Sequence, residues 1–332
     1  MTLSHDSLVG TQAPEFPQTA WLNSQPISLE KLRQDDKIVL VDFWTYSCVN
    51  CLRTLPHLSK WWQRYQDHGL VIIGVHSPEF AFEQDPANVQ AAVQRLGVTW
   101  PIALDPKHKI WQQYHNHYWP RHLLVDHTGT IVYDHIGEGN YRETEQAIQR
   151  ALQQVGASKL PSIGPLEHQH KLGAVCYPSS PETYLGNRRG VLKNREPFPV
   201  GKFTVFQDPK LPERPGVSLV GRWRIEDEYV ANDPSDQQAH CSLIFSGLGV
   251  NLVASADSPT EVSVTLNDTP IQPEQRGHDI TIDDSQTILT VDTARMYQLV
   301  SSKRPIGYGK LRLAPRGAMR AYVFTFGHCS DE

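Results

Sequence analysis

Two kinds of hydrophobic pattern divide this chain. Up to about residue 155, apolar runs of strand length alternate with segments whose apolar positions recur every three or four residues, as on one face of a helix. From about residue 177 onward, short runs of alternating apolar and polar positions follow one another between turn sequences. The first pattern predicts an α/β domain, and the second predicts an all-β antiparallel domain.

We therefore expect two domains, residues 1–155 and 177–332, joined by a linker over 156–176. The start of the linker contains Pro161 and Gly164, residues that interrupt helices and strands. A chain of 332 residues is also longer than one domain usually needs. The second domain is expected to be a jelly-roll-like sandwich, with the one tryptophan of an alternating strand, Trp223, in its core.

The clearest elements of the first domain are two nearly unbroken apolar runs, residues 38–44 and 70–75, typical of strands covered on both faces. Helical spacing appears at 52–65 and 143–155, and also after Asp85-Pro86, an N-cap followed by proline at the first helical position. A hairpin turn is predicted from Asp126 to Gly129. Together these elements predict a central sheet of four or five strands with helices on both sides.

A Cys-x-x-Cys sequence stands where the strand 38–44 passes into the next helix. At a helix N-terminus, unpaired N–H groups and the positive end of the helix dipole favour a thiolate over a thiol, and Cys48 is better placed for this than Cys51. Two thiols at this spacing can close into a disulfide with little backbone movement. The pair can therefore alternate between dithiol and disulfide by exchange with a partner, which requires no cofactor.

The other cysteines and the histidines give little support for a metal site. A zinc site would need a second Cys/His pair at ligand spacing, whereas Cys176, Cys241 and Cys329 each stand alone. Histidine pairs at 115–117 and 168–170 occur in a chain with 15 histidines, so each is weak evidence for a ligand set. We expect no metal and three buried cysteines, with a further disulfide as the alternative.

The dithiol segment resembles a known family. Val41-Asp42-Phe43-Trp44 followed by Cys48-Val49-Asn50-Cys51 resembles the active-site strand and helix of thioredoxin, and Pro56 falls where that family kinks this helix. Residues up to about 155 resemble a TlpA-type thioredoxin domain. The whole chain resembles the soluble C-terminal half of DipZ-type proteins, in which such a domain precedes a carbohydrate-binding-module-like β-domain. The resemblance implies a thioredoxin fold and a protein thiol-disulfide oxidoreductase.

The resemblance also implies catalytic roles. Cys48 matches the thiolate that attacks a partner's disulfide, and Cys51 matches the residue that resolves the mixed disulfide. Asp42 matches the buried acid that takes the proton from the resolving cysteine. Because burial disfavours the charged carboxylate, such an acid suits a base working near neutral pH. A strand-end aspartate that reaches water is the alternative for Asp42.

Four residues are candidates for holding the substrate. Pro120 matches the cis-proline that faces the dithiol in the thioredoxin family, and Trp119 is then the residue that offers backbone hydrogen bonds to an extended substrate segment. Trp44 ends the strand before the dithiol. Glu79 follows the second strand at its carboxyl end, where open α/β sheets place ligands. Glu79 is either a second acid near the dithiol or a solvated loop residue.

The expected partners are proteins with thiols or disulfides, with a membrane electron donor as a further candidate. The expected direction is reductive, although Val49-Asn50 matches no pattern that fixes it. A thiol peroxidase of the peroxiredoxin kind is one alternative, because the run from Thr45 to Cys48 has that family's Thr-x-x-Cys spacing. A glycan- or protein-binding module with a subsidiary redox domain is another.

Charge and hydropathy bear on partners and location. The net charge of −5 provides no basic field to attract nucleic acid. No apolar run approaches the length needed to cross a bilayer, and the first residues lack the pattern of a secretory signal. The chain as written is therefore expected to be soluble and cytoplasmic. A fragment of a membrane-anchored DipZ-type protein would be extracytoplasmic.

Overall fold

The computed structural model describes residues 7–163, 178–194, 196–209 and 215–327. The chain divides into two compact units, residues 1–169 and 170–332. The division falls inside the predicted linker, 156–176, whose own bounds stay a prediction. Residues 164–176 of that linker lie outside the described residues, and so do Cys176 and Cys329.

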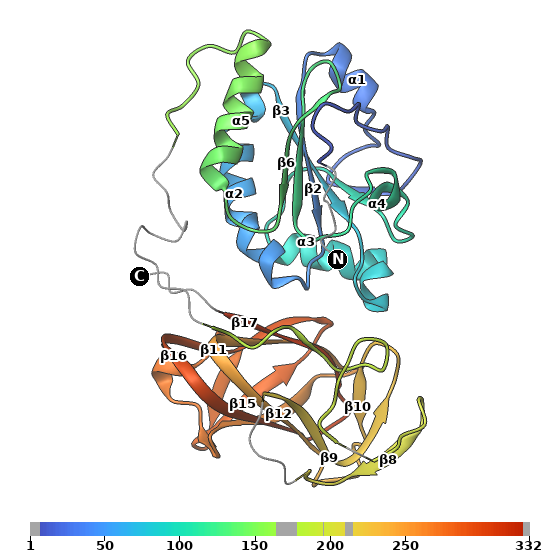
Figure 1. Ribbon diagram of the computed structural model, residues 1–332, viewed down its shortest axis with the longest axis vertical. Helices are drawn as coiled ribbons and strands as arrows, with labels where there is room; N and C mark the ends of the chain where they lie inside the picture. The colour runs from blue at the N-terminus through green and yellow to red at the C-terminus, as the bar shows by residue number, and fades with distance from the viewer. Residues whose placement is uncertain (1–6, 164–177, 195, 210–214, 328–332) are drawn as a thin grey trace. The chain divides into compact units, whose positions relative to one another are not determined.

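The first unit is built on a six-stranded sheet in the order β1-β4-β3-β2-β5-β6 (Figure 1). At its centre, β2 (Ile38–Trp44) is parallel to β3 (Leu70–His76) and antiparallel to β5 (Arg121–Val125). Farther out, β4 (Ile102–Leu104) is parallel to β3, and β6 (Ile131–Ile136) is antiparallel to β5. Every residue of β2 is buried, as its apolar run predicted.

The sixth strand corrects the prediction of four or five. β1 (Trp21–Leu22) pairs antiparallel with β4 at the edge of the sheet. The backbone N–H of Leu104 donates to the carbonyl of Ala20 at 2.9 Å, which continues the pairing. Two residues are too short to carry a periodic pattern, so only the tertiary pairing defines this strand.

Helices cover both faces of this sheet. α2 (Val49–Tyr65), α3 (Pro86–Arg95) and α5 (Tyr141–Gln154) contribute to the core on one face, together with even-numbered residues of β2. α1 (Leu29–Gln34) and α4 (Lys109–Gln113) contribute to the core on the other face, together with odd-numbered residues of β2. Figure 1 shows α2 and α5 on one side of the sheet and α1 and α4 on the other. Two single turns of 3-10 helix complete the unit, at Gln66–His68 and Ala81–Gln84.

Short local signals fix several boundaries as predicted. Asp85 caps α3 by accepting the N–H of Ala87, and Pro86 is the first helical residue. The predicted hairpin turn is present, with the N–H of Gly129 donating to the carbonyl of Asp126 at 3.0 Å. The start of α3 and the hairpin turn each depend on one or two neighbouring residues, so they could be predicted from the sequence.

The second unit is an antiparallel β structure, which confirms the predicted class. All pairings between its named strands are antiparallel. Its strands are β7 (Thr183–Tyr184), β8 (Phe203–Phe206), β9 (Gly216–Ile225), β10 (Val230–Asn232), β11 (His240–Ser255), β12 (Thr260–Leu266), β13 (Thr269–Pro270), β14 (Ile280–Asp283), β15 (Gln286–Val291), β16 (Arg295–Pro315) and β17 (Arg320–Gly327), with one 3-10 turn at Pro273–Gln275.

Two long strands hold this second sheet together. β11 pairs with β9 through its first residues and with β17 through its last, and it pairs with β16 along most of its length. The β11–β16 register shifts near Gly247 and Gly249, which lets the strands bend. One apolar core results, in which Trp223 is fully buried as predicted.

Candidate active site

Cys48 lies at the start of α2, where the predicted strand-to-helix passage occurs. It is the N-cap residue of the helix, and its Sγ accepts the backbone N–H of Cys51 at 3.2 Å. Its side chain is half-buried. A sulfur that accepts a helix N-terminal N–H is stabilised as a thiolate, and its partial exposure leaves it open to a partner.

Cys51, one turn into the same helix, has the opposite environment. Its side chain is fully buried, and neither it nor Cys48 forms a disulfide in this structure. Burial raises the pKa of the Cys51 thiol well above its usual range, and a hydrogen bond to the Cys48 thiol and the nearby charges of Cys48 and Asp42 raise it further. The pair therefore combines an accessible sulfur with a protonated, shielded one.

Asp42 points to the same face of the sheet as Cys51, because side chains alternate along β2 and its even-numbered neighbours line the α2 side. Its side chain is fully buried. Nε2 of His122 on the adjacent strand lies 3.2 Å from Oδ1. The N–H of the ring is not aligned with the carboxylate, so within the described residues neither oxygen of Asp42 has a hydrogen-bond partner.

The predicted substrate-binding segment has the expected backbone. The peptide bond between Trp119 and Pro120 is cis, which confirms that part of the prediction. Trp119 is half-buried; its indole Nε1 donates to the carbonyl of Ser77 at 3.0 Å, and its ring lies 4.3 Å from that of Trp111. Trp119 and Cys48 border the same hydrophobic core. The contacts fix the Trp119 ring, while its role toward a substrate stays a prediction.

A buried acid that the sequence did not single out supports the segment before Cys48. Glu83 accepts hydrogen bonds from the hydroxyls of Thr45 at 2.5 Å and Ser47 at 2.6 Å. It also accepts the backbone N–H groups of Ser47, Glu79 and Phe80. Burial raises the pKa of the Glu83 carboxyl, although these hydrogen bonds oppose the shift.

Trp44 differs from what we expected, and both alternatives for Glu79 stay open. Glu79 is half-buried, and the acid that bonds the dithiol segment is Glu83, four residues later. Trp44 is only 1% exposed and packs edge-on against His76, with ring centroids 5.4 Å apart. Such burial leaves no surface for a docked partner, so we replace the expected substrate contact of Trp44 with a packing role.

Two functional candidates were missed, and each had a weak signal. Glu83 follows Phe80 and Phe82 in a short apolar stretch, which was a hint that its carboxyl is buried. His122 directly precedes the apolar run from Leu123 to Val125, and the alternation of β5 places it on the Leu124 side. Its position opposite Asp42 depends on strand register, which a single sequence does not reveal.

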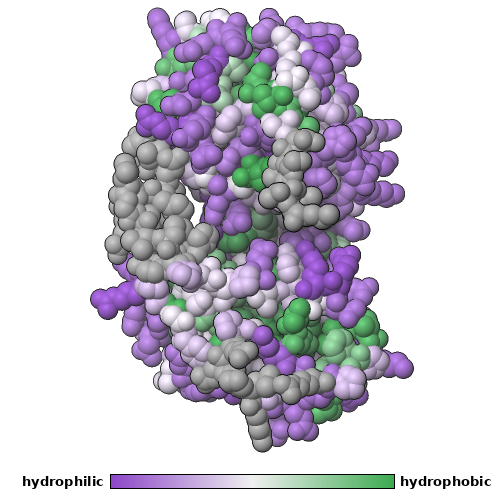
Figure 2. Space-filling model, viewed as in Figure 1, coloured by the Kyte–Doolittle hydropathy of each residue, from purple (hydrophilic) through white to green (hydrophobic). Residues whose placement is uncertain are grey.

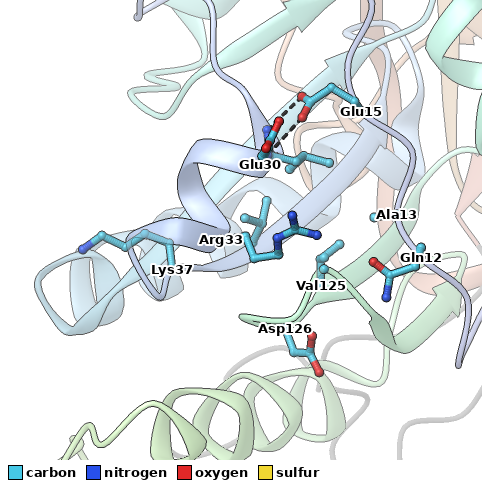
Figure 3. A pocket seen from close by; sticks show the side chains of 11 residues that line it. Gln12, Ala13, Glu15, Glu30, Arg33, Lys37, Val125 and Asp126 are labelled. Atoms are coloured by element: carbon cyan, nitrogen blue, oxygen red, sulfur yellow. Dashed lines mark hydrogen bonds between the residues drawn. The ribbon is translucent and has the colours of Figure 1, made fainter.

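A hollow in the first unit lies away from these residues. It holds about 240 Å³ and is lined by residues of α1, the N-terminal segment and the β5–β6 turn, among them Glu15, Arg33 and Asp126 (Figure 3). Glu15 accepts the N–H groups of Leu29 and Glu30 there, so it caps α1. Cys48 and Cys51 do not line this hollow.

Among the described residues, no group of three or more His, Cys, Asp or Glu side chains is arranged to hold a metal ion. Among the same residues, no helix combines the length and the apolar character that crossing a bilayer requires.

Comparison with known proteins agrees with this geometry. Residues 9–134 match the AhpC/TSA family, and residues 180–327 match the "Thioredoxin like C-terminal domain" family. The thiol-disulfide oxidoreductase ResA of Bacillus thuringiensis is 30% identical over 142 residues, 43% of this chain and 78% of ResA. The chain belongs to the TlpA-type, thioredoxin-like family of thiol-disulfide oxidoreductases. A second relative named a thiol-disulfide oxidoreductase, YkuV of Bacillus subtilis, is 28% identical over 41% of this chain and 89% of YkuV.

One relative of this TlpA-type protein extends over both units. Protein DipZ of Mycobacterium tuberculosis is 37% identical over 258 residues, 74% of this chain but 36% of DipZ. The chain thus spans about a third of the length of that relative. The expected thioredoxin fold is confirmed, since the first unit has the central β2–β3 parallel pair, the antiparallel β5–β6 hairpin and helices on both faces.

The second unit of the TlpA-type protein buries Cys241 in its apolar core. Burial raises the pKa of the Cys241 thiol to about 12, and its neighbours in the core are apolar. Exposed apolar side chains gather near β8, where Phe203 and Val205 are 38% and 61% exposed. Figure 2 shows hydrophobic surface over this end of the unit.

Proposed function

We propose that this chain is a thiol-disulfide oxidoreductase that reduces protein disulfides through Cys48 and Cys51. The single observation that carries the proposal is the contrast between the two sulfurs. Cys48 is half-exposed and accepts a helix N-terminal N–H, whereas Cys51 is fully buried with a raised thiol pKa. The Cys48 sulfur is thereby suited to attack a partner at the surface, and the Cys51 sulfur is suited to stay protonated until the second step.

The exchange proceeds in two steps. The Cys48 thiolate attacks one sulfur of a partner's disulfide, and the other sulfur leaves with the electron pair of the broken bond. Cys51 then gives up its proton, with Asp42 as the base, and attacks Cys48 Sγ. A Cys48–Cys51 disulfide forms, and the partner's second sulfur leaves as a thiolate that takes a proton from solvent.

Trapping of the intermediate tests the proposal. In a Cys51→Ser variant the second step is blocked, so we expect covalent mixed disulfides through Cys48 to accumulate with disulfide-containing proteins, detected by non-reducing electrophoresis and mass spectrometry. A Cys48→Ser variant should form none. Cys241→Ser is the matched control, because that thiol is buried in the second unit and should not affect trapping. Absence of Cys48-linked complexes in Cys51→Ser would refute the proposal.

Direction needs its own measurement. We propose the reductive direction, and the equilibrium of the Cys48–Cys51 pair with glutathione tests it. A potential below that of the cytosolic glutathione pool would agree with a reductant, and a potential near that of strong oxidants would reverse the assignment.

A thiol peroxidase is the second candidate, supported by the AhpC/TSA match and by the spacing of Thr45 and Cys48. One contact weighs against it. The Thr45 hydroxyl is fully buried and donates to Glu83, so its proton is not free to serve a peroxide at Cys48. Peroxide turnover measured beside the reduction of insulin disulfides separates the two activities.

Finer partner assignments rest on the relatives. A membrane electron donor is proposed from the likeness to DipZ. A glycan-binding role of the second unit would need exposed aromatic rings; Trp223 is buried, but Phe203 and Tyr308 are 38% and 40% exposed. Glycan binding by the full chain, lost in a Phe203→Ala variant, would support that role. For the compartment, we keep the two expected alternatives, cytoplasmic for the chain as written and extracytoplasmic within a longer DipZ-type protein.

A further inference from the structure

Three ionisable side chains lie in one row across the first sheet. Asp42 on β2 is the register partner of His122 on β5, and His122 is the register partner of His135 on β6. Directly opposed residues on neighbouring strands project to the same face of a sheet. This face is the one covered by α2, and the ring of Trp61 in α2 lies 6.2 Å from the ring of His122.

The inner part of the row is buried without the hydrogen bonds that burial normally demands. Asp42 and His122 are both fully buried. Apart from their 3.2 Å approach, the two carboxylate oxygens and the two ring nitrogens have no hydrogen-bond partner among the described residues. A buried polar group without a partner destabilises the fold, and apolar residues at these positions would avoid that cost. Structural stability therefore does not explain the pair.

The outer part of the row reaches the surface. His135 is half-buried, and its ring centroid lies 6.3 Å from that of His122. Nε2 of His135 is buried without a partner among the described residues, whereas Nδ1 lies 3.3 Å from the side-chain amide of Asn140, an exposed residue before α5. One ring nitrogen of His135 is thus shielded, and the other lies beside an exposed side chain.

At the inner end of the row, Asp42 lies near the resolving cysteine, Cys51. Cys51 is fully buried, and the negative charge of Asp42 is among the causes that raise the pKa of its thiol. The thiol must nevertheless lose a proton each time it attacks Cys48. A fully buried group has no direct contact with water, so this proton needs a route through the protein.

We propose that Asp42, His122 and His135 carry the proton of Cys51 across the sheet to the surface beside Asn140. The proposal rests on the proposed function, because it concerns the second step of that exchange. Cys51 gives its proton to Asp42, Asp42 passes it to His122, His122 passes a proton on to His135, and His135 releases a proton to solvent. The electrons stay with the sulfurs, and the sequence reverses when the dithiol is regenerated. The two histidines act through Asp42 and are positioning residues.

Other ionisable groups surround the row and enter its pH dependence. Burial lowers the pKa of His135, and the neighbouring His122 lowers it further, while Asp134 and Glu143 raise it. The backbone of Glu138 also raises the pKa of His135, and the Glu138 carboxylate pairs with Arg53 of α2 at 3.1 Å. A lowered pKa keeps His135 neutral near pH 7, as a group that must both accept and release a proton requires.

The reaction of the reduced full chain with dithionitrobenzoate, an aromatic disulfide that releases a coloured thiolate, separates the two steps. The first burst reports attack by Cys48, and the second reports displacement by Cys51. A Cys48→Ser variant measures the background from the remaining thiols. A wild-type chain that shows no second burst would refute the proposed function itself, independently of the proton path.

Two variants test the path. His122→Gln should slow the second burst about tenfold at neutral pH without changing the first, a smaller loss than that of a direct general base because His122 acts through Asp42. The deficit should shrink as pH rises, because hydroxide can then take the proton. His135→Gln should slow the second burst less, and added imidazole should restore it, since the lost ring is the half-exposed one. His127→Gln, in the turn of the same hairpin, is the matched control and should change neither burst.

Two outcomes would overturn the path. One is a second burst with wild-type rates over the whole pH range in both His122→Gln and His135→Gln. The other applies if His122→Gln does not fold, because His135→Gln is then the deciding variant. In that case the proposal is contradicted if the second burst of His135→Gln has the wild-type rate. It is also contradicted if that burst is slow and added imidazole does not restore it.

Discussion

Asp42 and Glu83 are both fully buried acids of the first unit, but the protein surrounds their oxygens differently. Glu83 accepts two hydroxyl and three backbone hydrogen bonds, which fill its acceptor positions. Asp42 has one poorly aligned approach from His122 and no hydrogen bond among the described residues. The first carboxylate holds a segment in place, whereas the second has free lone pairs for a proton.

The comparison shows that burial alone does not identify a catalytic acid. Desolvation acts on both side chains, but only a carboxylate with unfilled acceptor positions can take a proton without breaking existing bonds. Cys51 and Cys241 show the same principle for thiols, since burial raises the pKa of both. At Cys241 burial is the one cause of the raised pKa, whereas at Cys51 the charge of Asp42 contributes as well.

The largest expected effect is at Asp42. Asp42→Asn keeps the shape but removes the base, so we expect the second burst of the dithionitrobenzoate reaction to slow about 100-fold at neutral pH, within the range for general-base catalysis. The free energy of unfolding should stay unchanged or rise, because a neutral amide costs less to bury than a carboxylate. Stopped-flow rates and urea unfolding measure the two quantities. Wild-type resolution by Asp42→Asn would remove Asp42 from the mechanism.

At Glu83 we expect a smaller effect, and we expect it on folding stability and not on the rate of the second burst. In Glu83→Gln one carboxylate oxygen is replaced by an amide nitrogen that cannot accept, so the donors on that side of the side chain lose their acceptor. We expect the free energy of unfolding to fall by about 2 kcal/mol. The second burst should keep its wild-type pH dependence.

The matched control for Glu83 is Glu79→Gln, four residues earlier and half-buried. Its effect on the free energy of unfolding should be clearly smaller than that of Glu83→Gln. Should Glu83→Gln instead change the pH dependence of the second burst and leave stability intact, the two acids would have to exchange roles.

The sequence predicted those features that depend on neighbouring residues. The apolar run of β2, the Cys48 N-cap and the hairpin turn after Asp126 each have a local signal, and the structure contains all three. The cis bond before Pro120 followed from a family resemblance, because proline allows either isomer and only context selects one.

Features that depend on register or on long-range packing were missed. The approach of His122 to Asp42 is set by the pairing of β2 with β5, and Glu83 reaches Thr45 and Ser47 across 38 and 36 residues. In the second unit, β11 and β16 are much longer than the short alternating runs indicated, because bends near glycines such as Gly247 interrupt the alternation while the strand continues. Sequence periodicity therefore identified the β class but not the strand lengths.

The last prediction is a pH dependence and concerns His76, which belongs to the Glu83 region. Its Nε2 lies 3.3 Å from the Thr45 hydroxyl, whose proton is already given to Glu83, so Nε2 carries the proton and the ring is neutral. Burial lowers the pKa of His76 from 6.5 to about 3. At pH values between these two, the unfolded chain binds a proton that the folded chain does not. The free energy of unfolding should therefore decrease by about 1.4 kcal/mol for each unit by which the pH is lowered.

His76→Gln should remove this slope, and urea unfolding between pH 6.5 and pH 4.5 measures it. Glu83 acts in the opposite direction in this window. Because its folded pKa is raised above 4.5, the folded chain gains a proton first and is stabilised as pH falls. As the pH is lowered, the free energy of unfolding should therefore decrease more steeply in Glu83→Gln than in the wild type. The decrease should be least steep in His76→Gln. An identical slope in all three proteins would mean that neither group titrates differently on unfolding, and the contrast between the Glu83 and Asp42 regions would then rest on hydrogen bonds alone.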